Sequence, residues 1–151
     1  MAILVTGAAG FIGYSFCEKL AKINLKTKVI CIDNINNYYS IKIKKARLKK
    51  IKNFSNFKFF KIDLNNIIKL KKLFSKYKFT EVYNFAAQAG VRYSETNPLA
   101  YTKSNIEGFI NLISLSKENN TKKFFYASSS SVYGDNRNYP LKESEILFPK
   151  N

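Results

Sequence analysis

The 151-residue sequence contains no histidine, and it has only two cysteines, three prolines and one methionine. Without histidine or a Cys-x-x-Cys pair, it lacks the usual ligands of a zinc site, and we expect no metal. The two cysteines, Cys17 and Cys31, fall in a predicted helix and a predicted strand. This placement is typical of two buried free thiols in a reducing compartment.

Acidic residues are also scarce, at 10 against 26 lysines and arginines, so the formal net charge is +16. Such a surplus raises the alternative of a nucleic-acid-binding module or a protein bound to an anionic membrane. The lysines, however, are scattered over predicted helical faces, beside many Asn, Ile, Phe and Tyr residues whose codons are rich in A and T. We therefore interpret the charge as low-GC coding bias and predict neither a nucleic-acid nor a membrane partner.

Long apolar runs are absent as well. No segment reaches the roughly 18 residues that a membrane span needs. Met1-Ala2 leads directly into the apolar run Ile3–Thr6, with no basic region and no small-residue cleavage site. The sequence therefore predicts a cytoplasmic protein, and its length corresponds to one domain.

Apolar runs with β propensity alternate with longer segments of helical period. The predicted strands are Ile3–Thr6, Lys28–Ile32, Phe57–Ile62, Glu81–Phe85 and Lys123–Ala127. The predicted helices are Phe11–Ile23, Ile41–Lys52, Asn66–Lys76 and Pro98–Glu118, and the polar segment Asp135–Asn151 is predicted to be a loop. This alternation predicts an α/β fold: a doubly wound parallel sheet of the Rossmann type, with strand order 3-2-1-4-5.

A glycine-rich turn with Gly7, Gly10 and Gly13 joins the first strand to the first helix. A pyrophosphate needs backbone N–H donors and the positive end of a helix dipole, with no side chain in the way. Gly7 permits the tight turn, Gly10 lets the phosphates approach, and Gly13 lets the helix pack closely. Asp33 ends the second strand about 20 residues later, where a carboxylate binds the ribose hydroxyls. No arginine follows it to hold a 2′-phosphate, so these residues predict NAD rather than NADP.

With these motifs the sequence resembles the first part of an extended short-chain dehydrogenase/reductase, in the NAD-dependent epimerase/dehydratase family. The resemblance covers Ile3 to Asn151, and the stretches Asn37–Leu48 and Ala86–Ser94 resemble UDP-glucuronate 4-epimerases. UDP-galactose 4-epimerases and other sugar-nucleotide epimerases or dehydratases are the alternatives. The resemblance implies further contacts with NAD by Phe11, Ile12, Asn34, Asn37, Asp63, Leu64, Phe85, Ala86, Ala87, Gln88 and Ser104.

A serine cluster precedes the motif Val132-Tyr133-Gly134. Aligned on that motif, the family's catalytic Ser/Thr falls on Ser129, which is implied to hydrogen-bond the sugar hydroxyl at carbon 4. Dehydratases of the family carry an Asp-Glu pair just before the motif, and UDP-glucuronate decarboxylases usually carry a Glu there. The chain has Ser130 and Ser131 at these positions, and a serine hydroxyl does not do ionised acid–base work at neutral pH.

The resemblance therefore favours 4-epimerisation, in which a hydride leaves carbon 4, the keto sugar turns over and the hydride returns. Ser130 and Ser131 are expected to contact the UDP-sugar substrate. Arg92, in the loop after the fourth strand, is a further candidate, because a bidentate cation suits a carboxylate or a diphosphate. A solvated or ion-paired arginine is the alternative at that position.

The family's Tyr-x-x-x-Lys pair, which supplies the general base, is absent from the sequence. Tyr38 and Lys42 have the spacing but precede the serines, and we interpret them as a coincidence. We therefore expect residues 1–151 to be an incomplete NAD-binding domain without its C-terminal substrate domain, and to be inactive alone. The full-length enzyme is expected to be a homodimer. A non-catalytic dinucleotide-binding protein is the alternative class.

Overall fold

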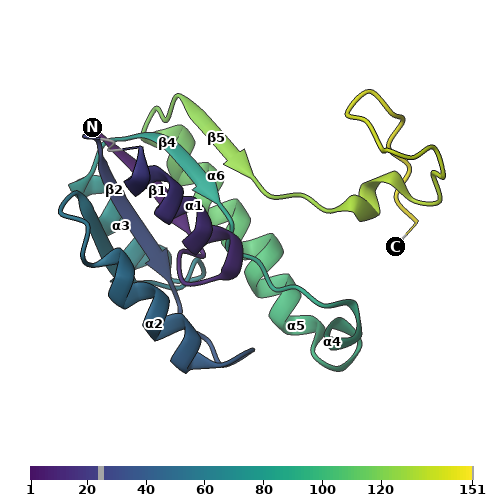
Figure 1. The fold of residues 1–151 in the computed structure, drawn as a ribbon, viewed down its shortest axis with the longest axis horizontal. Coiled ribbons are helices and arrows are strands. Elements are labelled where there is room, and N and C mark those ends of the chain that lie inside the picture. Colours follow the sequence, from purple (N-terminus) through teal and green to yellow (C-terminus); the bar gives the residue numbers. More distant parts are fainter. Residues whose placement is uncertain (24–25, 151) are drawn as a thin grey trace.

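The computed structural model describes residues 1–23 and 26–150, so that Asn151, the last residue of the predicted loop, lies outside the described residues. The strands form one parallel sheet in the order β3-β2-β1-β4-β5, which confirms the predicted order (Figure 1). The strands are β1 (Ala2–Thr6), β2 (Lys28–Asp33), β3 (Phe57–Lys61), β4 (Phe79–Asn84) and β5 (Lys123–Tyr126).

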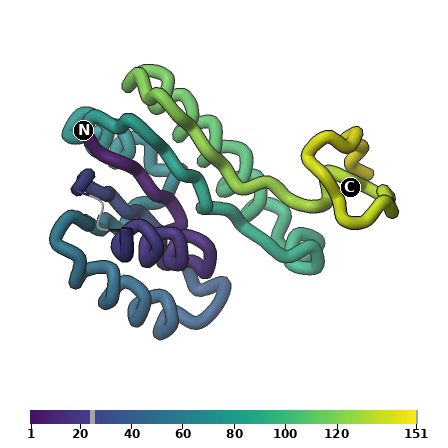
Figure 2. The backbone as a smooth tube through the Cα atoms, turned by 45° about the horizontal axis from the view of Figure 1, so that its top comes forward, coloured from purple at the N-terminus to yellow at the C-terminus, as the bar shows by residue number. Residues whose placement is uncertain are grey.

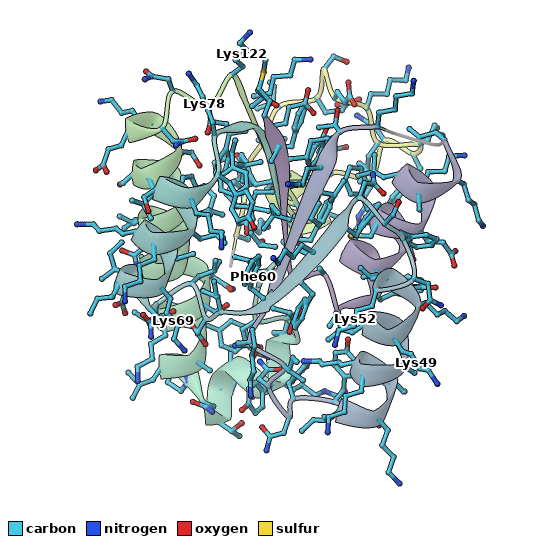
Figure 3. The ribbon with its side chains drawn as sticks, turned by 90° about the vertical axis from the view of Figure 1, so that its left-hand side faces the viewer. Lys49, Lys52, Phe60, Lys69, Lys78 and Lys122 are labelled. Carbon is cyan, nitrogen blue, oxygen red and sulfur yellow. The ribbon has the colours of Figure 1, made fainter. Side chains whose placement is uncertain are left out.

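Helices cover both faces of this sheet. The helices α1 (Phe11–Lys22) and α2 (Ile41–Ile51) contact each other on one face, and α3 (Ile67–Lys76) and α6 (Gly108–Glu118) contact each other on the other face (Figures 1 and 3). Shorter elements complete the fold: α4 (Val91–Thr96), α5 (Pro98–Tyr101), the π-helix η1 (Thr102–Glu107) and the 3₁₀-helix η2 (Ser130–Tyr133). The molecule is therefore the predicted three-layer α/β arrangement.

Each face of the sheet has its own apolar core, because successive side chains of a strand point to opposite faces. In β1, Leu4 packs in the core beside α3 and α6, and Val5 packs in the core beside α1 and α2. Burial on both faces explains why the central strands β1 and β2 are nearly continuous apolar runs rather than alternating ones. The buried cysteines belong to the α1–α2 core, where the sulfur atoms of Cys17 and Cys31 lie 3.6 Å apart as free thiols. The hydrogen bond to Cys17, together with burial, raises the pKa of the Cys31 thiol.

The carboxyl ends of β1 and β4 are joined by a buried hydroxyl group. Thr6 is fully buried, and its Oγ1 donates to Oδ1 of Asn84 at 2.5 Å. The same oxygen accepts the backbone N–H of Ala86 at 3.1 Å. Thr6 therefore fixes the spacing between the segment that follows β1 and the segment that follows β4.

Replacing Thr6 with valine, which has nearly the same shape, is expected to lower the free energy of unfolding by about 1–3 kcal/mol. The hydroxyl is lost, and the buried carbonyl of Asn84 and the N–H of Ala86 lose their partner. Urea denaturation measures the effect. Thr102→Val, at an exposed position of η1, is the matched control and is expected to change the stability by less than about 0.5 kcal/mol. Equal stability of the two variants would contradict the role given to Thr6.

The single helix predicted over Pro98–Glu118 is wrong in its middle, because η1 separates α5 from α6. Two tertiary contacts hold the chain where η1 lies. The Asn105 side chain pairs with the backbone of Gln88, and a Cβ on Gly108 would lie 2.8 Å from the Cβ of Leu64. A π-helical turn preserves an approximately helical pattern of apolar residues, so the sequence pattern does not reveal it. The short helix α4 was not predicted, and the ends of the strands differ from the prediction by one or two residues.

Residues 127–150 leave the sheet after β5 and lie apart from the main body (Figures 1 and 2). Apart from η2, this segment consists of turns and extended chain, which confirms the predicted loop over residues 135–150. It folds back on itself: Lys150 pairs with Asp135, and Gly134 has φ +58° and packs against the carbonyl of Phe148.

The lysines are spread over the molecule. Figure 3 shows Lys49 on α2, Lys52 just after the end of α2, Lys69 on α3 in the opposite helical layer, and Lys78 and Lys122 at the end of the sheet where β4 and β5 begin. This distribution differs from the one-sided basic face that nucleic-acid binding favours. No helix among the described residues combines the length and the apolar character that crossing a membrane requires.

Candidate functional site

The predicted cofactor residues gather at the carboxyl ends of the strands, where β1 lies between β2 and β4. After β1 the chain continues to the helices on one face of the sheet, and after β4 it continues to the helices on the other face. Open α/β sheets bind ligands at the point where the connections change face in this way, which is called the switch point. A cavity opens there. Of the predicted cofactor residues, those that line it are Gly7, Gly10, Asp33, Asn34, Asp63, Leu64, Phe85, Ala86, Ala87, Gln88 and Ser104.

The glycine turn forms one wall of this cavity and has no room for side chains at two positions. Gly7 has φ +63°, and a Cβ there would lie 2.7 Å from the backbone nitrogen of Ala86. A Cβ on Gly13 would lie 2.2 Å from the carbonyl oxygen of Gly7. Gly13 therefore lets the glycine-rich turn pack against the first helical turn of α1. The sequence pattern predicts instead that Gly13 lets the helix pack on the strand.

Gly10 has a different environment. A Cβ there would meet only the carbonyl of Gly7, at 3.0 Å from its oxygen, and the rest of its surroundings are open. Gly10 is also the N-cap of α1, and in the described chain no side chain caps this helix end. The first N–H groups of α1 are therefore left for a ligand, and the positive end of the helix dipole favours an anionic one.

Asp33 stands between the glycine turn and the loop that follows β2. Its side chain is mostly buried, with 8% exposed. Its Oδ2 accepts the N–H of Ala9 at 3.0 Å, and its Oδ1 accepts the N–H of Ile35 at 2.7 Å. Ile35 has φ +54°, which is strained for a β-branched residue and which this hydrogen bond helps to hold. A carboxylate has about four lone-pair sites, so Asp33 can still accept hydrogen bonds from a ligand.

Asn34 links the loop after β2 to the loop after β3. Its Nδ2 donates to Oδ2 of Asp63 at 2.9 Å, and its Oδ1 accepts the N–H of Asn36 at 3.0 Å. Oδ1 of Asp63 accepts the N–H of Asn65 at 3.0 Å. These bonds fix the wall of the cavity on which Leu64, a buried residue, also lies.

The segment after β4 forms the opposite wall. Asn105, on the π-helix η1, accepts the N–H of Gln88 at 2.7 Å and donates to the carbonyl of Gln88 at 2.9 Å. This two-sided pairing places Gln88 and the neighbouring Ser104 at the cavity. Single π-helical turns are frequent at functional sites, where they move side chains relative to a regular helix.

A second cavity shares this wall and extends toward β5. Phe85, Ala86, Ala87, Gln88 and Ser104 line both cavities, and Asn84, Ser128 and Ser129 line only the second. The hydroxyl oxygen of Ser129 accepts the N–H of Ser131 at 3.2 Å, and the two hydroxyls lie 3.2 Å apart. Ser130 and Ser131 line a separate cavity within the segment after β5. The structure therefore brings Ser129, but not Ser130 or Ser131, to the cavity that shares the predicted cofactor wall.

Several predicted site residues lie outside the first cavity. Phe11 and Ile12 are 73% and 56% exposed at the start of α1. Asn37 is exposed after β2, and Arg92 is exposed on α4. Gly13 does not line the cavity, because it packs against the backbone of the glycine-rich turn. Their contacts with a cofactor or a substrate stay predictions.

The sequence reasoning missed seven residues that line the first cavity: Thr6, Ile32, Asn36, Tyr38, Tyr39, Lys44 and Ile62. Both tyrosines lie within a stretch that carries the family resemblance, which was a usable signal. Lys44 lies in the same stretch, but nothing in the sequence distinguishes it from the neighbouring Lys42 and Lys45. Lys42 is exposed, and the described contacts include none between it and Tyr38, which agrees with a coincidental spacing.

The residues present fit the predicted NAD. Gly10 keeps the phosphate approach open, the uncapped end of α1 supplies N–H donors, and the carboxylate of Asp33 lines the same cavity. In the described ranges no three histidine, cysteine or acidic side chains gather as metal ligands would.

A model of the family described as GDP-mannose 4,6 dehydratase matches residues 4–151. The chain belongs to the GDP-mannose 4,6-dehydratase family. This assignment confirms the resemblance to NAD-dependent epimerases and dehydratases that the motifs indicate.

Curated relatives in this family include named epimerases. Protein CapI of Staphylococcus aureus is 48% identical over 147 residues, which are 97% of this chain and 43% of that protein. A UDP-glucuronate 4-epimerase of Thermodesulfobacterium geofontis is 45% identical over 130 residues, 86% of this chain and 40% of the relative. The chain thus spans less than half the length of these relatives.

Solved structures show the same fold. A UDP-glucuronic acid 4-epimerase from Bacillus cereus, in complex with UDP-glucuronic acid and NAD, matches with a TM-score of 0.86 and 33% identity over 99% of this chain and 46% of that chain. A UDP-glucose 4-epimerase from Thermus thermophilus, in complex with NAD, matches with a TM-score of 0.81 and 27% identity, over 99% of this chain and 45% of that chain. The predicted cofactor is thus the one bound in these structures.

Proposed function

We propose that the chain binds NAD and belongs to a UDP-sugar 4-epimerase that converts UDP-glucuronate to UDP-galacturonate. The cavity at the switch point carries this proposal, because it brings the glycine turn and Asp33 together and shares a wall with the cavity of Ser129. The epimerase names and bound NAD of relatives with the same fold support it.

In this proposal the pyrophosphate lies on the glycine turn, where Gly10 leaves the backbone open and α1 directs its positive end. Asp33 accepts the ribose hydroxyls. Gln88 and Ser104, which line both cavities, hold the cofactor where it passes between them. Bound NAD supplies the acceptor and donor of the hydride at carbon 4 of the sugar.

Ser129 is the proposed catalytic residue within this chain. Its hydroxyl lies at the second cavity, and the N–H of Ser131 orients it. It would hydrogen-bond the hydroxyl at carbon 4 as that group loses and regains its proton. Ser130 and Ser131 stand where dehydratases of the family carry their acid and base, which supports epimerisation over loss of water.

Because the chain spans less than half of its relatives, we propose that residues 1–151 form the NAD-binding domain of a longer protein. The remainder would hold the nucleotide of the substrate and supply the general base. Arg92, exposed on α4, is proposed to contact the substrate carboxylate or diphosphate, and a homodimer is proposed for the full-length enzyme.

An activity assay tests this function. The intact protein is incubated with NAD and UDP-glucuronate, and the products are separated by chromatography. UDP-galacturonate is the expected product. Conversion of UDP-galactose, with no turnover of UDP-glucuronate, would overturn the substrate assignment, and the absence of turnover with every UDP-sugar would favour a non-catalytic dinucleotide-binding protein.

Replacing Asp33 with alanine is expected to weaken NAD binding by roughly 1.5–3 kcal/mol, the scale of hydrogen bonds to a charged group. Isothermal titration calorimetry measures the dissociation constant. Glu118→Ala, at an exposed carboxylate on α6, is the control and should bind NAD like the unmodified protein. An unmodified protein that binds NAD and NADP equally well would contradict the role of Asp33.

A further inference from the structure

Lys44 is a buried cation at the ribose end of the first cavity. It lies on α2, is 4% exposed, and lines the cavity together with Asp33. Its Nζ donates to the backbone carbonyl of Asn36 at 3.0 Å and to Oδ1 of Asn36 at 2.6 Å, and lies 4.5 Å from the centre of the Tyr39 ring. Lysines are seldom buried this completely. These contacts hold the Lys44 ammonium group against the loop that follows Asp33.

The charges around Lys44 are mixed. Burial lowers the pKa of Lys44, the nearby carboxylate of Asp33 acts in the opposite direction, and the cation of Arg47 lowers the pKa again. Arg47, one turn further along α2, donates to the carbonyl of Ala9 at 3.2 Å and to the Tyr39 hydroxyl at 2.9 Å. Asp63 adds a second carboxylate to the cavity wall. Of these two cations of α2, Lys44 lines the cavity, and Asp33 is the nearby carboxylate that offsets its charge.

We propose that Lys44 is a latent ligand for a ribose 2′-phosphate, and that Asp33 and Lys44 together set the choice between NAD and NADP. This inference rests on the proposed binding of NAD. With Asp33 present, its carboxylate accepts the ribose hydroxyls and repels a phosphate. When Asp33 is removed, the cavity wall keeps the ammonium group of Lys44, whose position Asn36 fixes. A dianionic phosphate is the ligand that such a site favours.

The sequence prediction favours NAD over NADP because no arginine follows Asp33. The cation that a 2′-phosphate requires comes from the next helix, eleven positions along the chain. Asp33, rather than the absence of a cation, is then what excludes NADP from this cavity.

The test compares NAD and NADP binding by calorimetry in the intact protein freed of cofactor. Asp33→Ala is expected to lose affinity for NAD and to gain affinity for NADP. Adding Lys44→Met to Asp33→Ala is expected to weaken NADP binding by at least about tenfold, and to weaken NADP binding more than it weakens NAD binding. Asp33→Ala with Lys45→Met, at the adjacent exposed lysine, is the control and should behave like Asp33→Ala alone.

A second substitution at Lys44 is needed because Lys44→Met could prevent folding. Lys44→Gln keeps a donor for the carbonyl of Asn36 but has no charge, and in the Asp33→Ala background it should lose the same NADP affinity. If NADP binding is unchanged by both Lys44 substitutions, the inference is wrong and Lys44 only holds the loop. If the unmodified protein binds neither cofactor, the proposed function itself fails, which is a separate outcome.

Discussion

Gly13→Ala is expected to destabilise the protein by about 3 kcal/mol or more and to abolish measurable NAD binding. The added Cβ would lie 2.2 Å from the carbonyl oxygen of Gly7 and 2.8 Å from its carbonyl carbon. Both atoms belong to the backbone of the turn, so no side chain can rotate away, and the turn must open. Denaturation in urea measures the loss of stability, and calorimetry measures NAD binding.

Gly10→Ala is the matched control in the same turn. A Cβ at Gly10 would meet one oxygen at 3.0 Å and otherwise project into open space. We expect Gly10→Ala to cost less than about 1 kcal/mol of stability but to weaken NAD binding, because the methyl group occupies the phosphate approach. If Gly13→Ala keeps the stability and NAD affinity of the unmodified protein, the close contact with Gly7 does not control the turn.

The sequence was sufficient for the fold and for part of the site because the signals involved are local. Strand–helix alternation predicts the strand order, since right-handed crossovers leave few topologies. A glycine pattern at a strand–helix junction predicts the turn, and the end of the next strand places Asp33 beside it. The structure accordingly finds Gly7, Gly10 and Asp33 around one cavity.

The remaining features depend on contacts and chain turns that the residue pattern does not reveal. The burial of Lys44 requires α2 to pack beside the loop after β2, which no local pattern encodes. The π-helix depends on Asn105, whose pairing with Gln88 joins positions 17 residues apart in the sequence. Ser129 and Ser131 are two residues apart and yet line different cavities, because η2 turns the chain between them. Adjacency in sequence therefore did not decide which serines share a cavity.

Ser129→Ala is expected to lower the kcat of the proposed reaction in the intact protein by about 10²–10³, the range for removing one positioned donor from a transition state. Ser129 is exposed, and its hydroxyl bonds only Ser131 among the described residues. The fold should therefore remain intact and the KM for UDP-glucuronate should change little. Steady-state kinetics separates kcat from KM, and a melting curve checks that the variant is folded.

Ser128→Ala is the matched control, because Ser128 lines the same cavity one residue earlier in the chain. Its kcat should fall much less than that of Ser129→Ala. If the two effects are reversed, the alignment on Val132-Tyr133-Gly134 is off by one residue and Ser128 contacts the substrate. If neither substitution affects kcat, the second cavity does not hold the reacting carbon. The glycine turn and Asp33 would then mark a dinucleotide site whose chemistry takes place elsewhere in the protein.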